Sequence, residues 1–151
     1  MDKLVMAIAT GFYSGYTPKA PGTAGTLVAF PVHLLIVMLP GNGYYLALAA
    51  ILVLAIATAG MAEKIIDRQD PGMVVIDEII GMLIGLIAVP LTLPALATAF
   101  LLFRTFDIWK PFPVSWFDKH LHGGTGIVLD DVMAGIYTLA CMQGLIYLAV
   151  F

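Results

Sequence analysis

Charged residues are scarce in this sequence. Only 11% of its 151 residues are Asp, Glu, Lys or Arg, and 61% are hydrophobic, whereas an ordinary soluble domain has roughly 25% charged and about 45–50% apolar residues. The mean hydropathy is correspondingly high, at +0.99. Because so few polar side chains cannot cover a surface in water, the composition excludes an ordinary soluble domain and predicts an integral membrane protein.

Other absences exclude further classes of protein. Cys141 is the single cysteine, so no disulfide can form within the chain. The net charge is −3 and no cluster of Lys or Arg is present, which excludes nucleic acid as a partner. No Gly-x-x-x-x-Gly-Lys-Ser/Thr motif occurs, so a nucleotide-binding P-loop is not expected. Nothing in the sequence indicates the oligomeric state.

Long apolar runs separate small groups of charges. No charged residue lies between Lys19 and Glu63, between Glu78 and Arg104, or after Asp131. A bilayer core about 30 Å thick needs roughly 20 apolar residues in a helix. The runs are continuous rather than alternating, which favours membrane helices over a β-barrel. The sequence therefore predicts an all-α, polytopic helical membrane protein that forms a single domain over residues 1–151.

The run at residues 79–103 can be one long helix, giving four membrane helices, or a hairpin broken near Pro90 and Pro94, giving about five. The hairpin puts all seven Lys and Arg residues on one side of the membrane, as the positive-inside rule favours. We therefore expect a cytoplasmic N-terminus and a polar site on the cytoplasmic side. The turn at residues 40–43 separates the first two helices. The predicted spans cover residues 25–39, 44–62, 72–89, 95–109 and 131–151.

Five carboxylates and several cations are predicted to meet at one depth on the cytoplasmic side. An ionised side chain inside the bilayer costs about 2.5–3.5 kcal/mol, so such groups need partners or a role. One interpretation is neutralisation, with Arg104 paired to Asp107 and with Asp130 and Asp131 at a helix N-terminus. The other is a site for a hard divalent cation such as Mg²⁺, Mn²⁺ or Ca²⁺, because acids outnumber bases there. The acidic residues are Asp77, Glu78, Asp107, Asp130 and Asp131.

Small residues follow the acids at helical spacing. Gly81 and Gly85 come after the first acidic pair, and Ala134, Gly135 and Thr138 come after the last. Small side chains at this spacing let two helix backbones approach closely. We therefore expect the acids to border a tight helix–helix contact inside the bundle.

Two glycine-containing segments lie on the same predicted side, at residues 14–26 and 123–126. Backbone N–H groups at a helix N-terminus attract anions, and Lys19 adds a positive charge. Thr23 or Thr26 is expected to cap the helix that follows the first segment. The second segment is expected to form a loop just before the last helix. The residues predicted to bind a substrate phosphate are Lys19, Gly22, Thr23, Gly124 and Thr125.

Four motifs stand out along the chain: SGYTPKAPGTAGTL at residues 14–27, VIDEIIGMLIG at 75–85, FRTFDIWKPFP at 103–113 and WFDKHLHGGTGIVLDDVMAG at 116–135. Together they resemble the phosphatidylglycerophosphatase A family of bacterial membrane lipid phosphatases. One departure is Thr26, where a serine is common. The resemblance implies Mg²⁺-dependent removal of the terminal phosphate from phosphatidylglycerol phosphate in the bacterial cytoplasmic (inner) membrane. The expected partners are this phospholipid and the membrane.

The roles of the acids and cations follow as hypotheses. We expect Glu78, Asp107 and Asp131 to bind Mg²⁺, with Asp77 and Asp130 either as further ligands or as groups that contact the ligands. Water attacks the phosphoryl group with the help of the metal, and Asp130, a spare carboxylate, accepts the proton of the water. Lys110, Arg104 and Lys19 are expected to stabilise the phosphoryl charge, and Asp107 also counts among the catalytic residues.

Several alternatives stay open at this point. An aspartate rather than water can be the nucleophile. The substrate can be a different phospholipid. A divalent-cation channel or carrier would also line a helical bundle with acidic residues, although it would need polar groups across the whole membrane.

Overall fold

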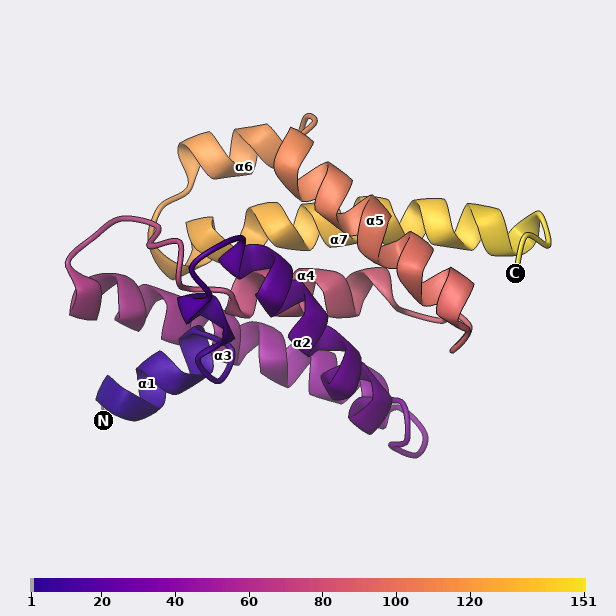
Figure 1. Cartoon of the computed structure of the whole chain (residues 1–151), viewed down its shortest axis with the longest axis horizontal. Helices are drawn as coiled ribbons and strands as arrows, with labels where there is room; N and C mark the ends of the chain where they lie inside the picture. Colours follow the sequence, from indigo (N-terminus) through magenta and orange to yellow (C-terminus); the bar gives the residue numbers. More distant parts are fainter. Residues whose placement is uncertain (1) are drawn as a thin grey trace.

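The structure is a computed structural model that describes residues 2–151, apart from the side chains of residues 118 and 119. The described chain is all-helical and contains no strand, which confirms the all-α part of the predicted fold class (Figure 1). Its elements are α1 (Asp2–Ala9), the 3-10 turn η1 (Ser14–Tyr16), α2 (Pro21–Ile36), α3 (Gly43–Ile66), α4 (Ile76–Gly85), α5 (Leu93–Trp109), α6 (Val114–His120) and α7 (Gly123–Tyr147).

The run at residues 79–103 forms two helices, so the alternative of one long helix is wrong. The backbone leaves the helix after Gly85, and α5 begins at Leu93 with a proline in its first turn. Pro90 lies in the connection, and the residue before a proline is pushed out of the α region. The connection is packed rather than loose, since Leu86 is fully buried and the side-chain amide of Gln143 donates a hydrogen bond of 2.8 Å to the carbonyl of Ile87.

The ends of several predicted helices are corrected by the structure. The helix expected at residues 72–89 is restricted to the ten residues of α4, which span about 15 Å, half the thickness of a bilayer core. The first and last predicted helices begin earlier than expected, at Pro21 and Gly123. The first turn of α2 comes from the end of the first glycine-containing segment, and the first turn of α7 is the second segment itself.

Two of the described helices, α3 and α7, are long and apolar enough to cross a membrane. Only 28% of the most apolar window of α3 is buried inside the protein, and Leu46 and Val53 on this helix are exposed. A large apolar surface of this kind marks a face that contacts lipid or protein. The helix α2 is apolar but has only 16 residues, so five membrane crossings stay a prediction.

The short helix α4 lies at the centre of the bundle. It contacts α2, α3, α5 and α7, and its interface with α7 is the most extensive one in the described chain. In Figure 1, α2 passes in front of α4 and α5 passes in front of α7. Eight of the ten residues of α4 are buried: Ile76, Asp77, Ile79, Ile80, Gly81, Met82, Leu83 and Gly85.

The predicted close packing of small residues is confirmed at the contact between α4 and α7. A β-carbon on Gly135 would overlap the carbonyl oxygen of Gly81, and one on Gly81 would lie 2.5 Å from the carbonyl oxygen of Asp131. One turn further on, a β-carbon on Gly85 would lie 2.8 Å from Cγ2 of Thr138. The absence of side chains at these glycines therefore lets the acidic residues of the two helices meet.

Candidate functional site

Three carboxylates from two helices form a compact cluster, which we call the carboxylate cluster. Asp77 and Glu78 occupy the first turn of α4, and Asp131 lies in the third turn of α7. One oxygen of each residue lies within 4.8 Å of an oxygen of both others. Asp77 and Asp131 are 7% and 4% exposed, and Glu78 is half-buried. Three of the five acids that were predicted to meet therefore form one group, and the two aspartates are shielded from solvent.

Two oxygens of the carboxylate cluster are buried without a hydrogen-bond partner among the described residues. They are Oδ1 of Asp77 and Oε2 of Glu78. A buried charged oxygen without a partner is strongly unfavourable, and neighbouring negative charges repel each other. The N-terminus of α4 compensates in part, since helix N-termini favour negative charge. A donor set made of carboxylate oxygens suits a hard cation such as Mg²⁺, so the residues present fit that ion.

The predicted ion pair on α5 is present beside the carboxylate cluster. Nη1 of Arg104 donates a hydrogen bond of 2.5 Å to Oδ2 of Asp107, one turn further along the helix. Asp107 lies outside the closest group of three acids, but its charge interacts with those of Glu78 and Asp131. Nε of Arg104 is buried without a hydrogen-bond partner in the described chain. Arg104 thus neutralises Asp107 and keeps a donor for a further group.

A second ion pair joins the end of α5 to α7. Nζ of Lys110 lies 2.8 Å from Oδ2 of Asp130. Asp130, the spare carboxylate expected to accept a proton, therefore has a cationic partner. Asp130 and Asp131 also lie well inside α7 rather than at its N-terminus, so neither of them caps that helix. The role of Asp130 as a proton acceptor stays a prediction.

The first glycine-containing segment lies directly against the carboxylate cluster. A β-carbon on Gly22 would overlap Oε1 of Glu78 and would lie 3.1 Å from Nη1 of Arg104. Lys19 is exposed in the turn just before α2. The predicted cap is wrong, because Thr23 and Thr26 are inside α2 and Ala20 precedes the helix without a side-chain cap.

The second glycine-containing segment packs helices together instead. Residues 123–126 form the first turn of α7 and not a loop. A β-carbon on Gly124 would overlap the carbonyl oxygen of Ile56 and would lie 2.8 Å from the backbone nitrogen of Gly60 on α3. Thr125 is exposed, and its hydroxyl donates a hydrogen bond of 3.3 Å to the carbonyl of His122. The structure thus explains Gly124 by close packing, and a phosphate contact at Gly124 or Thr125 stays a prediction.

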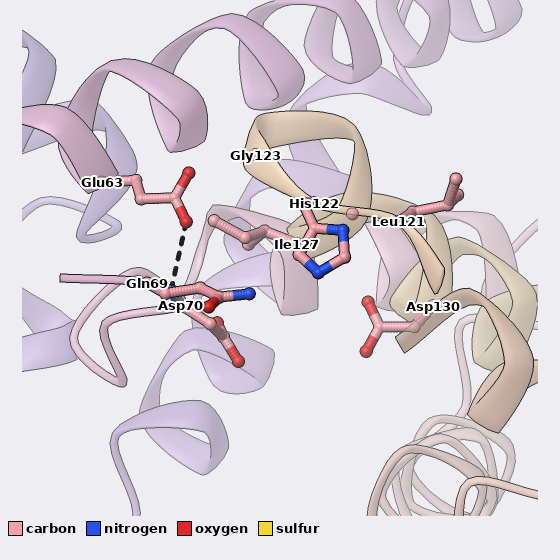
Figure 2. A pocket seen from close by; sticks show the side chains of 9 residues that line it. Glu63, Gln69, Asp70, Leu121, His122, Gly123, Ile127 and Asp130 are labelled. Atoms are coloured by element: carbon pink, nitrogen blue, oxygen red, sulfur yellow. Dashed lines mark hydrogen bonds between the residues drawn. The ribbon is translucent and has the colours of Figure 1, made fainter. Parts of the chain in front are cut away.

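A small pocket of about 40 Å³ borders Asp130. Figure 2 shows the carboxylate of Asp130 on one side of this pocket and Glu63 and Asp70 on the other, with His122 between them. Oε1 of Glu63 accepts a hydrogen bond of 3.4 Å from the backbone nitrogen of Asp70. Glu63 and Asp70 were not singled out in the sequence, where the only signal was their position at the end of an apolar run.

The fold and the site together indicate a class of protein. The chain is a bundle of apolar helices that gathers buried carboxylates and two ion pairs where the ends of α2, α4, α5 and α7 meet. Such a bundle is a membrane-associated helical protein with a candidate cation site at one end.

Comparisons with known proteins give the family. The family model of Phosphatidylglycerophosphatase A matches residues 7–146. Phosphatidylglycerophosphatase A of Escherichia coli (strain K12) is 40% identical over 130 residues, which cover 85% of this chain and 76% of that protein. The protein of the same name from Haemophilus influenzae is 37% identical over 142 residues, which cover 93% of this chain and 87% of that protein. The chain therefore belongs to the phosphatidylglycerophosphatase A family, as the four motifs predicted.

A third relative carries a different name. A Bacteroides thetaiotaomicron protein with the provisional name phosphatidylinositol-3-phosphatase is 39% identical over 142 residues, which cover 89% of each chain. No solved structure matches the chain. The relatives are thus named as phosphatases of phospholipids, with two different headgroups among them.

Proposed function

We propose that the protein hydrolyses the terminal phosphomonoester of phosphatidylglycerol phosphate and releases phosphatidylglycerol and phosphate. Membership of the phosphatidylglycerophosphatase A family supports this activity. The observation that carries it is the carboxylate cluster beside Arg104 and the first turn of α2. This arrangement offers ligands for a cation and donors for a phosphate at one end of an apolar bundle.

We assign the carboxylate cluster as the Mg²⁺ site. Asp77, Glu78 and Asp131 would hold the ion, and Asp107 lies next to them as a further ligand. A bound Mg²⁺ supplies Lewis-acid stabilisation of negative charge on the phosphoryl oxygens. The partnerless oxygens of Asp77 and Glu78 support this assignment, since a cation would satisfy both.

The groups around the cluster bind and orient the phosphate. The first turn of α2 leaves the N–H groups of Gly22 and Thr23 without intrahelical acceptors, and helix N-termini bind phosphate well. Arg104 lies against this turn and offers its Nε donor. Lys19 in the preceding turn and Lys110 add positive charge, which is what phosphoryl transfer requires of its surroundings.

Asp130 is our candidate for the proton acceptor. Lys110 holds its carboxylate at 2.8 Å and so fixes its position next to Asp131. An acceptor in this place can take the proton of the attacking water only if the water comes within hydrogen-bond reach. The competing route is direct attack by an aspartate, which would leave a transient phosphoryl-aspartate that can be trapped.

The site is proposed to face the cytoplasm of a bacterium from its inner membrane. The N-termini of α2, α4 and α7 and the C-termini of α3 and α5 are the helix ends that carry the basic residues and the acids. Five membrane segments with these ends inside obey the positive-inside rule. The short helix α4 is compatible with this topology, because non-helical backbone such as residues 86–92 is tolerated at membrane depth where protein surrounds it.

The test is phosphate release by the purified protein in detergent, with Mg²⁺ and then with EDTA. We expect release from phosphatidylglycerol phosphate that stops in EDTA and returns with Mg²⁺. Phosphatidic acid, phosphatidylinositol 3-phosphate and a water-soluble phosphomonoester serve as comparison substrates. A preference for phosphatidylinositol 3-phosphate would replace the proposed substrate with the one in the name of the third relative, and no release from any of them by folded protein would overturn the proposal.

A further inference from the structure

The helices α2 and α5 enclose a wholly apolar groove of about 470 Å³. The two helices touch through Phe30 and Phe100, whose ring centroids are 6.3 Å apart. Both helices also pack against α4, so the groove has rigid walls. Its main lining residues, which define what we call the apolar groove, are Leu27, Phe30, Leu96, Ala97, Phe100 and Leu101.

The walls of the apolar groove lead directly to the carboxylate cluster. On α2, Leu27 lies five residues after Gly22, about 7.5 Å along the helix. On α5, Leu101 lies three residues before Arg104, about 4.5 Å along the helix. Gly22 and Arg104 are in near contact, since a β-carbon on Gly22 would lie 3.1 Å from Nη1 of Arg104. The Arg104 side chain of α5 thus reaches the first turn of α2 at the proposed phosphate-binding end, and the groove residues follow along both helices away from it.

We infer that the apolar groove binds one acyl chain of the phospholipid substrate while the phosphate of the headgroup lies between Gly22 and Arg104. This inference rests on the proposed function. In phosphatidylglycerol phosphate the terminal phosphate is joined to two long apolar chains through a glycerol, a phosphodiester and a second glycerol. The site has the same order of surfaces, with donors and a cation at one end and then apolar side chains alone. Pockets of roughly 300–1,000 Å³ with apolar linings are typical ligand sites.

The position of the apolar groove also favours an acyl chain as its occupant. A lipid substrate moves sideways in the bilayer and meets the protein on its lipid-facing surface. Leu27 and Leu101 are exposed there, 53% and 64%, at the end of the groove nearest the cluster. A chain entering between them would be guided so that its headgroup reaches Arg104, which makes the groove a determinant of chain-length preference.

The test fills the groove and compares substrates that differ only in chain length. Ala97 is exposed on α5 and lines the groove, so Ala97→Trp places an indole where the chain would lie. Ala50→Trp is the matched control, because Ala50 is exposed on α3 and lines neither this groove nor any pocket described here. Initial rates are measured in mixed micelles with palmitoyl and hexanoyl forms of phosphatidylglycerol phosphate.

For Ala97→Trp we expect KM for the palmitoyl substrate to rise about tenfold, as when roughly two methylene groups lose their apolar contacts. The kcat values and the KM for the hexanoyl substrate should stay within about twofold, and Ala50→Trp should change neither. Equal effects of the two variants, or an unchanged ratio between the two substrates, would overturn the groove assignment. If the wild type released no phosphate, that result would instead contradict the proposed function itself.

A second measurement on the unaltered protein does not depend on how the variants fold. Phosphatidylglycerol phosphate with a diazirine on one acyl chain is photolysed with the wild-type protein, and the labelled peptides are mapped. Labelling concentrated on residues 27–30 and 96–101, and reduced by excess unlabelled substrate, is the expected result. Labelling spread evenly over the exposed face of α3 would contradict the inference.

Discussion

The two ends of the bundle both bury polar groups, but they satisfy them differently. At one end, the carboxylate cluster leaves oxygens of Asp77 and Glu78 without hydrogen-bond partners in the described chain. At the other, the hydroxyl of Tyr44 donates to the carbonyl of Leu83 at 3.2 Å and contacts Nδ1 of His33 at 3.2 Å, with the two rings edge to face. Here Nε2 of His33 is also buried without a hydrogen-bond partner in the described chain, but these groups carry no obligatory charge, and the protein itself joins the two rings.

The two ends show which buried polar groups stabilise the fold and which indicate a ligand site. A buried polar group with protein partners contributes to stability, whereas a cluster of charges that the protein leaves uncompensated calls for a ligand. His33 lies eleven residues after Gly22 on α2, about 16 Å along the helix. Changes at one end should therefore affect activity, and changes at the other should affect stability alone.

The largest effect is expected from Asp131→Asn. Removing one charge from the carboxylate cluster should lower phosphate release at least roughly 100-fold, because a metal ligand is lost. The melting temperature in EDTA should stay the same or rise, since the repulsion between buried carboxylates falls. Activity and thermal unfolding in detergent are measured together. Asp67→Asn, at an exposed acid that ends α3, is the control, and wild-type activity in Asp131→Asn would remove the metal role of the cluster.

Binding of Mg²⁺ should itself stabilise the wild-type protein. A ligand that binds only the folded state at 100 times its Kd adds about 2.7 kcal/mol to the free energy of unfolding. The melting temperature should therefore rise with Mg²⁺ in the absence of any substrate. The shift should vanish in Glu78→Gln, and persistence of the full shift in that variant would place the ion elsewhere.

An intermediate effect is expected from Gly22→Ala. The added methyl group would overlap the carboxylate of Glu78, so the carboxylate must move and phosphate release should fall roughly tenfold, with a destabilisation of about 1–3 kcal/mol. Activity per folded molecule is compared with that of Gly144→Ala on α7, where a β-carbon meets nothing within 4 Å. If both variants behaved like the wild type, Gly22 would have no role in positioning Glu78.

The smallest effect, and one confined to stability, is expected from Tyr44→Phe. Loss of the hydroxyl leaves the carbonyl of Leu83 and Nδ1 of His33 without this partner, which costs about 1–2 kcal/mol in the free energy of unfolding. Phosphate release should stay within about twofold of wild type, because the change lies at the other end of the bundle. Denaturant unfolding and the activity assay check both parts, and a large loss of activity without loss of stability would abolish the distinction between the two ends.

Much of the architecture was predictable from local chemistry. The apolar runs predicted helices without strands, and the prolines near residue 90 predicted the break between α4 and α5. Gly81 and Gly135 predicted the close approach of two helices, because only small residues allow it. The acids that border this contact were therefore expected to meet before their positions were known.

Other features were not predictable from spacing. The segment at residues 123–126 contains glycines that are typical of loops, yet packing against α3 makes it the first turn of α7. The pairing of Lys110 with Asp130 joins residues 20 positions apart, and it depends on how α5 lies on α7. Intrinsic preferences describe a residue and its near neighbours, and tertiary contacts override them.

The sequence by itself determined the helical class, the grouping of the charges and the family, because these follow from composition, periodicity and motifs along the chain. Only the tertiary structure decided that Asp77, Glu78 and Asp131 form the closest group, that Gly22 rather than Gly124 lies against it, and that α2 and α5 leave an apolar groove leading to it. The physical reason is that each of these features arises between helices. Their relative placement is set by side-chain packing across the whole bundle, which no local pattern records.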